Sequence, residues 1–330
     1  MVVQNDERTT TNDSPKFNCS ILVNSSYFVN EKIKTMIPLI ITMDLEIAKD
    51  YNLDQQRLSL RKIQDSFNEL KLQFTTFTTS EAVEYFPHEL KAIHSNGNEI
   101  GCHGLNHGSD ENYKTLNADT ISSNIQKSTN NIVSITNASP TSFRGPGMST
   151  SVNTHRVLIN RGYKSDFSIC PQRLDFMRTK GGDTGWLFAP RLPYNPSDES
   201  PYKKGSLPLW VVPLSCIGFP FISGMLYILG LRFMKLFFRM LLRESLKNNK
   251  PIVYIFHSYE FAKYTGSKEL KNDKAGINRN KRSIIHRLYS SVPEARYSIN
   301  LEFIRYMLSF DIVKPFTGNK YTEKLISDAR

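Results

Sequence analysis

The chain has 330 residues, of which 39% are hydrophobic and 22% are charged, and its formal net charge is +11. This composition is typical of a globular enzyme with a sizeable core. The basic excess suggests anionic surroundings such as a membrane face or an anionic glycan, but no zinc-finger, homeodomain or RNA-recognition motif indicates a nucleic-acid partner.

The four cysteines, at positions 19, 102, 170 and 216, are scattered and lack the paired spacing of metal ligands. We therefore expect free thiols in a reducing compartment. Residues 1–33 are rich in Asn, Ser and Thr and are predicted to form a flexible tail, whereas residues 34–330 are predicted to form a single domain. The tail has no charged stretch followed by a long apolar run, so no secretory signal peptide is recognised and a cytoplasmic location is expected.

The first predicted strand, residues 36–43, is an apolar run that ends abruptly in Asp44-Leu45-Glu46. Residues i and i+2 of a strand point to the same side, so Asp44 and Glu46 are expected to emerge together. Two carboxylates at the end of a buried strand cost desolvation free energy, so their presence there suggests that they bind a cation or transfer a proton. The alternative is that both are solvated residues just past the strand.

Strands and helices are expected to alternate in the next hundred residues. A helical pattern covers 55–71, a β-rich stretch covers 74–78, and a helix over 81–95 is expected with Ser80 as its cap. Another helix is predicted near 117–136. This alternation predicts a parallel sheet covered by helices, in which functional loops gather at the carboxyl ends of the strands.

Two histidines stand four residues apart in the stretch GCHGLNHG, residues 101–108. A helix, or a strand end that runs into a turn, can aim both imidazoles of such a pair at one point, as a divalent metal requires. A glycine follows each histidine and lets the backbone come close to a ligand. The alternative is an ordinary pair of loop histidines.

Residues 141–147 predict a short strand that runs into a Gly/Pro turn, and Ser151 is expected to cap a helix that ends at Arg161. Residues 162–166 lead to another strand end. Residues 171–206 are loop-like and could border a substrate groove.

The segment 207–231 contains no acidic or basic residue and is long enough for a membrane span. Its three prolines and three glycines instead favour a strand, a turn and the start of a helix. Four basic residues then fall on one helical face of the largely apolar stretch 231–243, which suits a membrane surface. The alternative is a packed helix with a solvated basic stripe.

The end of the chain supplies one more candidate for the site. Residues 251–256 predict the last clear inner strand, directly before His257. A basic surface loop is expected over 268–290, a helix over 300–309, and a strand that closes the sheet over 311–313.

The order of these motifs resembles the NodB-type polysaccharide deacetylases, metal-dependent N-deacetylases of carbohydrate esterase family 4. The motifs are Asp44-Leu45-Glu46, His103-x-x-x-His107, Phe143-Arg144-Gly145-Pro146, Asp166, and Ile255-Phe256-His257. The resemblance covers about residues 36–316, and the nearest branch has an Asp-x-Glu first motif and a His-x-Tyr-Glu-Phe ending, here His257-Ser258-Tyr259-Glu260-Phe261. It implies an α/β fold, a distorted (β/α) barrel with about seven parallel strands, and one polysaccharide-deacetylase catalytic domain over residues 34–330.

The resemblance also implies roles for the motif residues. Glu46, His103 and His107 would bind a divalent metal, and zinc suits two imidazoles and one carboxylate. Its charge would lower the pKa of a water molecule and polarise the acetyl carbonyl. Asp44 would be the base that takes a proton from the water, and His257 the acid that protonates the leaving amine.

Arg144 matches the arginine that orients the base carboxylate, and the amide of Gly147 could help to hold the oxyanion. The chain departs from the family pattern at three points. Leu45 intervenes in the first motif, where two aspartates are usually adjacent, and Gly147 stands where a tyrosine is usual. Asp166 has no tryptophan four residues on, so it either supports His257 or only lines the site.

The sequence thus predicts a metal-dependent hydrolase that removes N-acetyl groups from an amino-sugar-containing glycan or glycolipid. The expected substrate is a lipid-linked or nucleotide-linked sugar, reached by a cytoplasmic protein that is peripheral at the inner membrane face. Two alternatives stay open: a deformylase or cyclic-amide hydrolase with the same site, and a catalytically silent carbohydrate-binding protein. The presence of all five motifs argues against the silent protein.

Overall fold

The structure is a computed structural model that describes residues 36–172, 185–263 and 292–330. The predicted tail, residues 1–33, and the predicted basic loop, residues 268–290, lie outside the described residues. The described part belongs to one compact unit, Thr35–Arg330.

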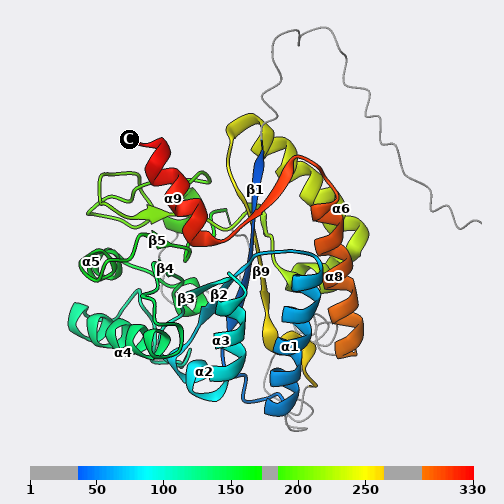
Figure 1. The fold of residues 1–330 in the computed structure, drawn as a ribbon. Helices are drawn as coiled ribbons and strands as arrows, with labels where there is room; N and C mark the ends of the chain where they lie inside the picture. The colour runs from blue at the N-terminus through cyan, green and yellow to red at the C-terminus, as the bar shows by residue number, and fades with distance from the viewer. Residues whose placement is uncertain (1–35, 173–184, 264–291) are drawn as a thin grey trace, which may run out of the picture. The chain divides into compact units, whose positions relative to one another are not determined.

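Eight strands form one sheet in which every strand pair is parallel. They are β1 (Ile37–Leu45), β2 (Thr75–Thr78), β3 (Glu99–Cys102), β4 (Ser142–Phe143), β5 (Ser165–Asp166), β6 (Trp210–Val211), β9 (Ile252–His257) and β10 (Val313–Phe316). The order is β10-β1-β2-β3-β4-β5-β6, and β9 also pairs with β1. The distorted (β/α) barrel predicted from the sequence is confirmed (Figure 1).

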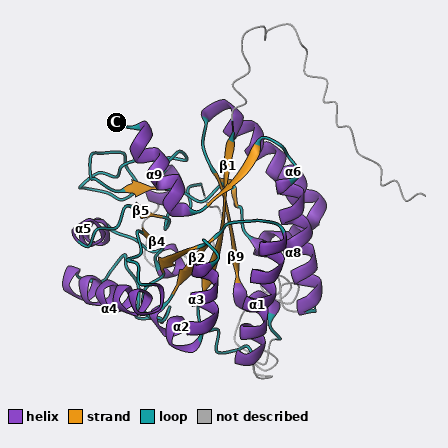
Figure 2. Ribbon diagram, in the orientation of Figure 1, coloured by secondary structure: helices purple, strands orange, loops and turns teal. Residues whose placement is uncertain are grey.

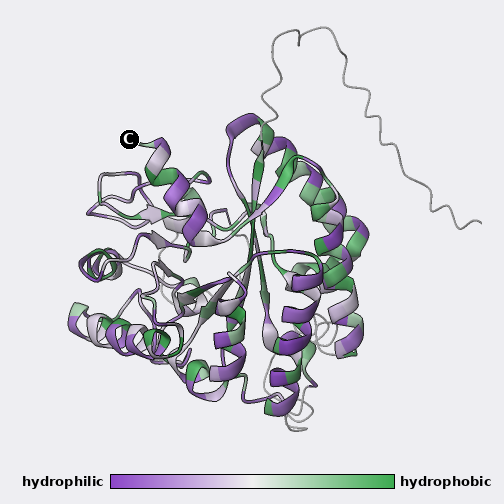
Figure 3. Ribbon diagram, in the orientation of Figure 1, coloured by the Kyte–Doolittle hydropathy of each residue, from purple (hydrophilic) through white to green (hydrophobic). Residues whose placement is uncertain are grey.

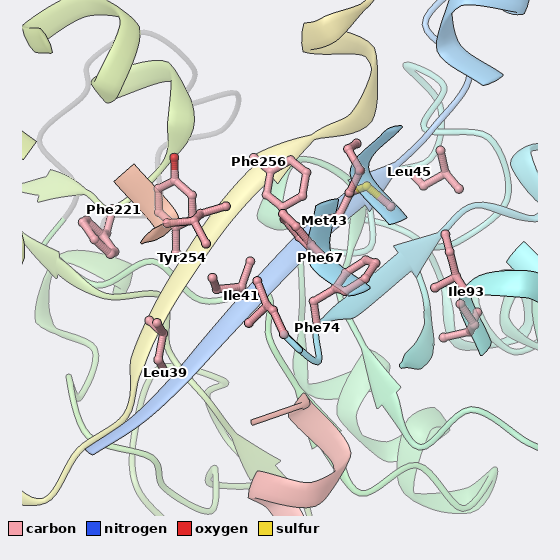
Figure 4. Packing of buried hydrophobic residues seen from close by; sticks show 14 of the residues in the cluster. Leu39, Ile41, Met43, Leu45, Phe67, Phe74, Ile93, Phe221, Tyr254 and Phe256 are labelled. Carbon is pink, nitrogen blue, oxygen red and sulfur yellow. The ribbon is translucent and has the colours of Figure 1, made fainter. Parts of the chain in front are cut away.

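The central strand β1 is buried along all nine residues, because it pairs with three neighbours and is covered on both faces. Leu39, Ile41 and Met43 belong to the large cluster between the sheet and the helices, which includes Phe67 and Phe74 (Figure 4). Ile40 instead belongs to a second cluster, on the inner face of the sheet. Since side chains alternate along a strand, the even-numbered positions of β1 point into the barrel.

Helices surround the sheet (Figure 2). They are α1 (Leu53–Glu69), α2 (Ser80–Tyr85), α3 (Pro87–Ser95), α4 (Ala118–Thr136), α5 (Val152–Asn160), α6 (Ser223–Asn248), α8 (Pro293–Leu308) and α9 (Gly318–Asp328). Single turns of 3₁₀-helix occur at η1 (Pro146–Met148), η2 (Gly185–Phe188) and η3 (Ser258–Phe261). The short strands β7 (Cys216–Ile217) and β8 (Phe219–Pro220) form an antiparallel pair of their own.

The prediction of a single helix over 81–95 was wrong. The chain forms two helices there, α2 and α3, which are separated at Phe86. Pro87 disfavours helical backbone at the preceding residue and can only begin a new helix. The cap of α2 is Thr79 rather than Ser80, because the Thr79 side chain accepts the bond from the backbone of Ala82. The predicted cap Ser151 of α5 is confirmed, since its side chain accepts from the backbone of Thr154.

The uncharged segment 207–231 contains β6, β7 and β8 and the first turns of α6, as its prolines and glycines predicted. Within the described ranges, none of the helices combines the length and the apolar character that a bilayer crossing requires. The predicted basic helix over 231–243 lies inside α6, which begins at Ser223 and changes direction at Gly230. Gly230 has a φ of +81°, a conformation that favours glycine.

Candidate metal and catalytic centre

The candidate residues gather at one edge of the sheet. Asp44 near the end of β1 and His257 at the end of β9 are register partners in adjacent parallel strands, so their side chains leave the sheet in the same direction. Glu46 follows β1, and His103 follows β3 directly. Because the carboxyl ends of parallel strands meet at one edge, residues far apart in the chain share this place.

The ring of His103 is oriented for metal binding. Its Nδ1 lies 2.6 Å from the carbonyl oxygen of Arg144, so the Nδ1–H group donates there and Nε2 is left as a free ligand atom. His103 is buried, and burial holds its pKa below the usual value despite the nearby charge of Asp44. The imidazole is therefore neutral, as a metal ligand must be.

Glu46 and His107 complete the donor set. Oε2 of Glu46 lies 3.2 Å from Nε2 of His107, and the same nitrogen accepts a hydrogen bond of 3.1 Å from the amide of Gly147. Oε2 of Glu46 is buried and has no hydrogen-bond partner. Ligand atoms of Glu46, His103 and His107 all lie within 4.8 Å of one another. Oε2 of Glu46 and Nε2 of His107 are thus two acceptor atoms in close contact, and the first has no donor. A cation between them would satisfy both, and two imidazoles with one carboxylate are ligands that suit zinc.

Glu111 holds the loop that carries His107, although the sequence analysis assigned it no role. Its carboxylate accepts hydrogen bonds from the backbone amides of Leu105, Asn106 and His107, at 2.5, 2.9 and 3.0 Å. His107 has a φ of +59°. Gly104 has a φ of +75°, and a Cβ added there would lie 2.3 Å from the Glu111 carboxylate. An acidic residue in a polar loop gives no sign in the sequence that it will be buried.

Arg144 binds the proposed base. Its Nη1 donates to Oδ1 of Asp44 at 2.5 Å and to Oγ1 of Thr42 at 2.9 Å. The guanidinium is fully buried and lies over the ring of Phe77, 4.3 Å from the centroid. Burial alone would raise the pKa of Asp44, but the charge and hydrogen bond of Arg144, together with the charge of His257, bring this pKa below its usual value. Asp44 is thus an oriented carboxylate, with Oδ2 4.0 Å from Nε2 of His103.

His257 has a carboxylate partner of its own. Its Nδ1 lies 2.9 Å from Oε1 of Glu260, which also accepts from Oγ of Ser223, and the hydroxyl of Tyr227 donates to Oε2. Burial disfavours the charged imidazole, but the hydrogen bond and charge of Glu260, with the charges of Asp44 and Glu46, raise the pKa of His257 to about 9. His257 is therefore protonated at neutral pH.

Asp166 does not reach His257, in contrast to one of the two roles expected for it. Its carboxylate lies 2.8 Å from Nε2 of His155 and accepts from Oγ1 of Thr150 and from the backbone and hydroxyl of Ser168. The Ser168 hydroxyl in turn accepts from the amide of Gly145, next to Arg144. Asp166 thus holds the third motif, Phe143-Arg144-Gly145-Pro146, in place through Ser168. Its partner His155 is buried, and the sequence analysis assigned His155 no role.

Residues 53–165 match the family model for polysaccharide deacetylases. The peptidoglycan deacetylase of Helicobacter pylori (strain ATCC 700392 / 26695) is 30% identical over 103 residues, which are 31% of this chain and 34% of that protein. Residues 53–165 are thus similar to polysaccharide deacetylases, in line with the resemblance of the sequence motifs. The chain spans about a third of the length of this curated relative. The matched region of the deacetylase family includes His103, His107 and Arg144 and ends before His257.

Solved structures share the fold of this chain over most of its length. A candidate polysaccharide deacetylase from Mycobacterium smegmatis is 14% identical, with a TM-score of 0.59 over 91% of this chain and 94% of that one. The PuuE allantoinase is 15% identical, with a TM-score of 0.55 over 89% of this chain and 91% of that one. At such identities the likeness shows the fold alone, and this fold carries proteins named for different substrates.

Proposed function

We propose that the protein is a metal-dependent hydrolase that removes N-acetyl groups from an amino-sugar-containing glycan or glycolipid. One observation carries the proposal: a three-residue donor set lies beside an ionised, arginine-bound Asp44, whose register partner is a protonated His257. The polysaccharide deacetylase family of the domain supports an amide of a carbohydrate as the bond that is cleaved.

Glu46, His103 and His107 would hold the metal, most simply zinc. A divalent cation at these residues would supply Lewis acidity toward water and toward the acetyl oxygen. The carbonyl of Arg144 fixes the ring of His103, and the carboxylate of Glu111 fixes the loop of His107, so both imidazoles are oriented before any ligand arrives.

Asp44 would act as the general base. It lies two residues from Glu46 and directs Oδ2 toward His103, while Oδ1 is occupied by Arg144. The proton from the attacking water would pass to the free oxygen as the new C–O bond forms at the acetyl carbon. Arg144 orients the carboxylate and does not itself take part in proton transfer.

His257 would act as the general acid. Its Nδ1 is engaged by Glu260, so Nε2–H is the proton available to the substrate. This proton would pass to the amide nitrogen as the C–N bond breaks, which releases acetate and a free amine. The raised pKa keeps the proton on the ring at neutral pH until the leaving nitrogen becomes basic enough to take it.

The amide of Gly147 would donate to the acetyl oxygen as negative charge develops there. Gly147 has a φ of +61°, and its N–H points at Nε2 of His107. This left-handed conformation favours glycine, and a tyrosine at this position would be strained. The ring of Tyr259 lies 5.1 Å from His257 and 5.1 Å from Tyr51, and we assign to these two rings the aromatic wall of the sugar site.

The name of the Helicobacter pylori relative makes acetylated peptidoglycan fragments the first substrates to test. A lipid-linked or nucleotide-linked amino sugar is the second class, for a protein that works in the cytoplasm at the inner membrane face. The buried free thiols of Cys102 and Cys216 are compatible with a reducing compartment.

The deciding experiment couples metal analysis of the purified protein to a product screen on these substrates. We expect about one zinc per chain and the release of acetate together with a free amine. Formate as the product would favour a deformylase, and hydrolysis of a cyclic amide alone would favour the allantoinase-like alternative. Bound metal without turnover of any of these substrates would identify a silent carbohydrate-binding protein and refute the proposal.

A further inference from the structure

A line of apolar side chains is exposed along α6 and takes no part in the proposed chemistry. Leu229, Phe233, Leu236 and Met240 are 39%, 38%, 57% and 44% exposed. Phe233, Leu236 and Met240 follow each other at three and four residues, which places them on one face of the helix after Gly230, and Leu229 lies just before the change of direction at Gly230. We refer to these four residues as the apolar ridge. Single exposed apolar residues are ordinary on protein surfaces, but four within twelve residues of one helix are a notable feature.

Basic residues border the apolar ridge on one side. Arg232, Arg239 and Arg243 are exposed and follow each other at seven and four residues, which makes a parallel strip on the same helix. The one acidic residue of α6, Glu244, is already bound by Arg191 and Lys250, each at 2.6 Å. Over the part of the chain that the structure describes, neither Arg232 nor Arg243 has an ion-pair partner.

The apolar ridge is not needed to hold α6 in place. The opposite face of the helix carries Met234, Phe237, Phe238 and Leu241, which are buried in the main core. The side chains of Phe238 and Tyr306 pack edge to face, which joins α6 to α8. Figure 3 shows how hydrophobic and hydrophilic residues are interleaved along α6.

We propose that the exposed face of α6 is a docking surface for an anionic lipid bilayer. An interfacial helix of this kind lies in the plane of the headgroups, with its apolar residues among the acyl chains and its arginines at the phosphates. The net charge of +11 adds a long-range attraction to such a surface.

A bilayer fits this face better than the other occupants. Two copies of the chain that met through α6 would bring their arginine strips together, at a cost in repulsion. The segment 264–291 of the same chain has a net positive charge, with seven basic and two acidic residues, and would be repelled in the same way. Only a partner that has both an apolar interior and a negatively charged surface can bury the apolar ridge and pair with the arginines at the same time.

The docking surface begins beside the candidate site. Tyr227 precedes Leu229 by two residues, and its hydroxyl donates to Glu260, the partner of His257. A bilayer against α6 would therefore lie close to the residues around His257. The proposal concerns binding alone and stands whether or not the protein is a deacetylase.

The test is sedimentation of the full chain with phosphatidylcholine vesicles that contain or lack phosphatidylglycerol, at low and at high salt. We expect binding to the anionic vesicles that weakens as salt is added. The pair Arg232→Gln and Arg243→Gln should weaken it about thirtyfold, since each basic residue near an anionic surface contributes about a fivefold factor. The matched control, Lys127→Gln with Lys164→Gln, removes two exposed charges elsewhere and should change binding little.

The apolar ridge is tested by Phe233→Ser with Leu236→Ser, which should weaken binding roughly tenfold or more. Leu58→Ser, at an equally exposed leucine of α1, is the control. If the first pair lowers the melting temperature, Leu229→Ser with Met240→Ser gives the same test. The proposal fails if the wild type ignores anionic vesicles, if the variants bind as the wild type does, or if the apolar ridge variants instead abolish a dimer seen by sedimentation velocity.

Discussion

At the scale of single residues, the separate roles of Asp44 and His257 can be tested by the leaving group. Asp44→Asn should lose roughly 10²–10⁴-fold in rate on any substrate, because no base remains for the water. His257→Ala should lose as much on an N-acetyl sugar but far less on an activated acetate ester, whose leaving group needs no proton. The measurement is kcat on both substrates, with metal content as the control. Equal rescue of both variants by the ester would show that the two roles are not separate.

Glu260 is expected to set the upper limit of the active pH range. His257 is protonated below its raised pKa of about 9 and loses its proton above it, so activity should fall as the pH rises through about 9. Glu260→Gln removes the charge that holds the proton and should move this limb toward 6.5, the ordinary value. The pH profile of kcat measures the shift. Glu302→Gln, at an exposed glutamate of α8, should leave the limb in place, and an unmoved limb in Glu260→Gln would refute the assignment.

Glu111 should act on metal affinity rather than on chemistry. Its carboxylate collects three backbone amides of the loop before and at His107, and Glu111→Gln leaves only one oxygen to accept them. Loss of such an orienting partner typically costs about 10–100-fold in metal affinity. Titration with a competing chelator gives the affinity, and Asp110→Asn, at the exposed neighbour, is the control. An unchanged metal affinity in Glu111→Gln would mean that the loop around His107 keeps its conformation without the Glu111 carboxylate.

At the scale of elements, a buried carboxylate at the amino ends of the strands ties the last helix to the sheet. Oε2 of Glu99 in β3 accepts from the hydroxyl of Thr75 and from the amide of Asn319, at 2.8 and 2.9 Å, and the same hydroxyl accepts from Gly318. Glu99→Ala should lower the free energy of unfolding by about 1–3 kcal/mol, because the amide at the start of α9 is left buried without its partner.

Urea unfolding measures this loss as a lower midpoint. Glu69→Ala, at an exposed glutamate of α1, should change the midpoint little. Metal binding should be the same in Glu99→Ala as in the wild type, because Glu99 lies at the opposite end of β3 from His103. A wild-type midpoint in Glu99→Ala would show that α9 is held by its apolar contacts alone.

At the scale of the whole molecule, bound metal should stabilise the fold. A ligand that binds only the folded state at 100 times its dissociation constant adds about 2.7 kcal/mol to the free energy of unfolding. Thermal unfolding with zinc and with a chelator should therefore differ for the wild type and for His88→Ala, an exposed histidine outside the site. His103→Ala should keep its fold but lose most of its metal and all of this difference. Full metal occupancy in His103→Ala would remove it from the ligand set.

The sequence alone predicted which motifs form the candidate site and at which edge of the sheet they lie. Alternating apolar strands and amphipathic helices specify a parallel sheet covered by helices, and polar residues directly after apolar runs then lie at its carboxyl edge. Asp44, His103, Arg144 and His257 could be predicted together for this reason. The family resemblance of these motifs supplied their roles, which local patterns do not carry.

Only the tertiary structure decided which polar side chains support that site. Glu111 and Glu260 stand in loop-like sequence, and Asp166 is paired with His155 and Ser168 rather than with His257. The exposure of the apolar ridge on α6 was also decided by the tertiary structure. Helical spacing predicts which residues share a face of a helix, but not which face is covered by neighbouring elements. Hydrophobic periodicity is a local property of the chain, whereas burial and pairing of a charge depend on residues a hundred positions away, as between Asp44 and Arg144.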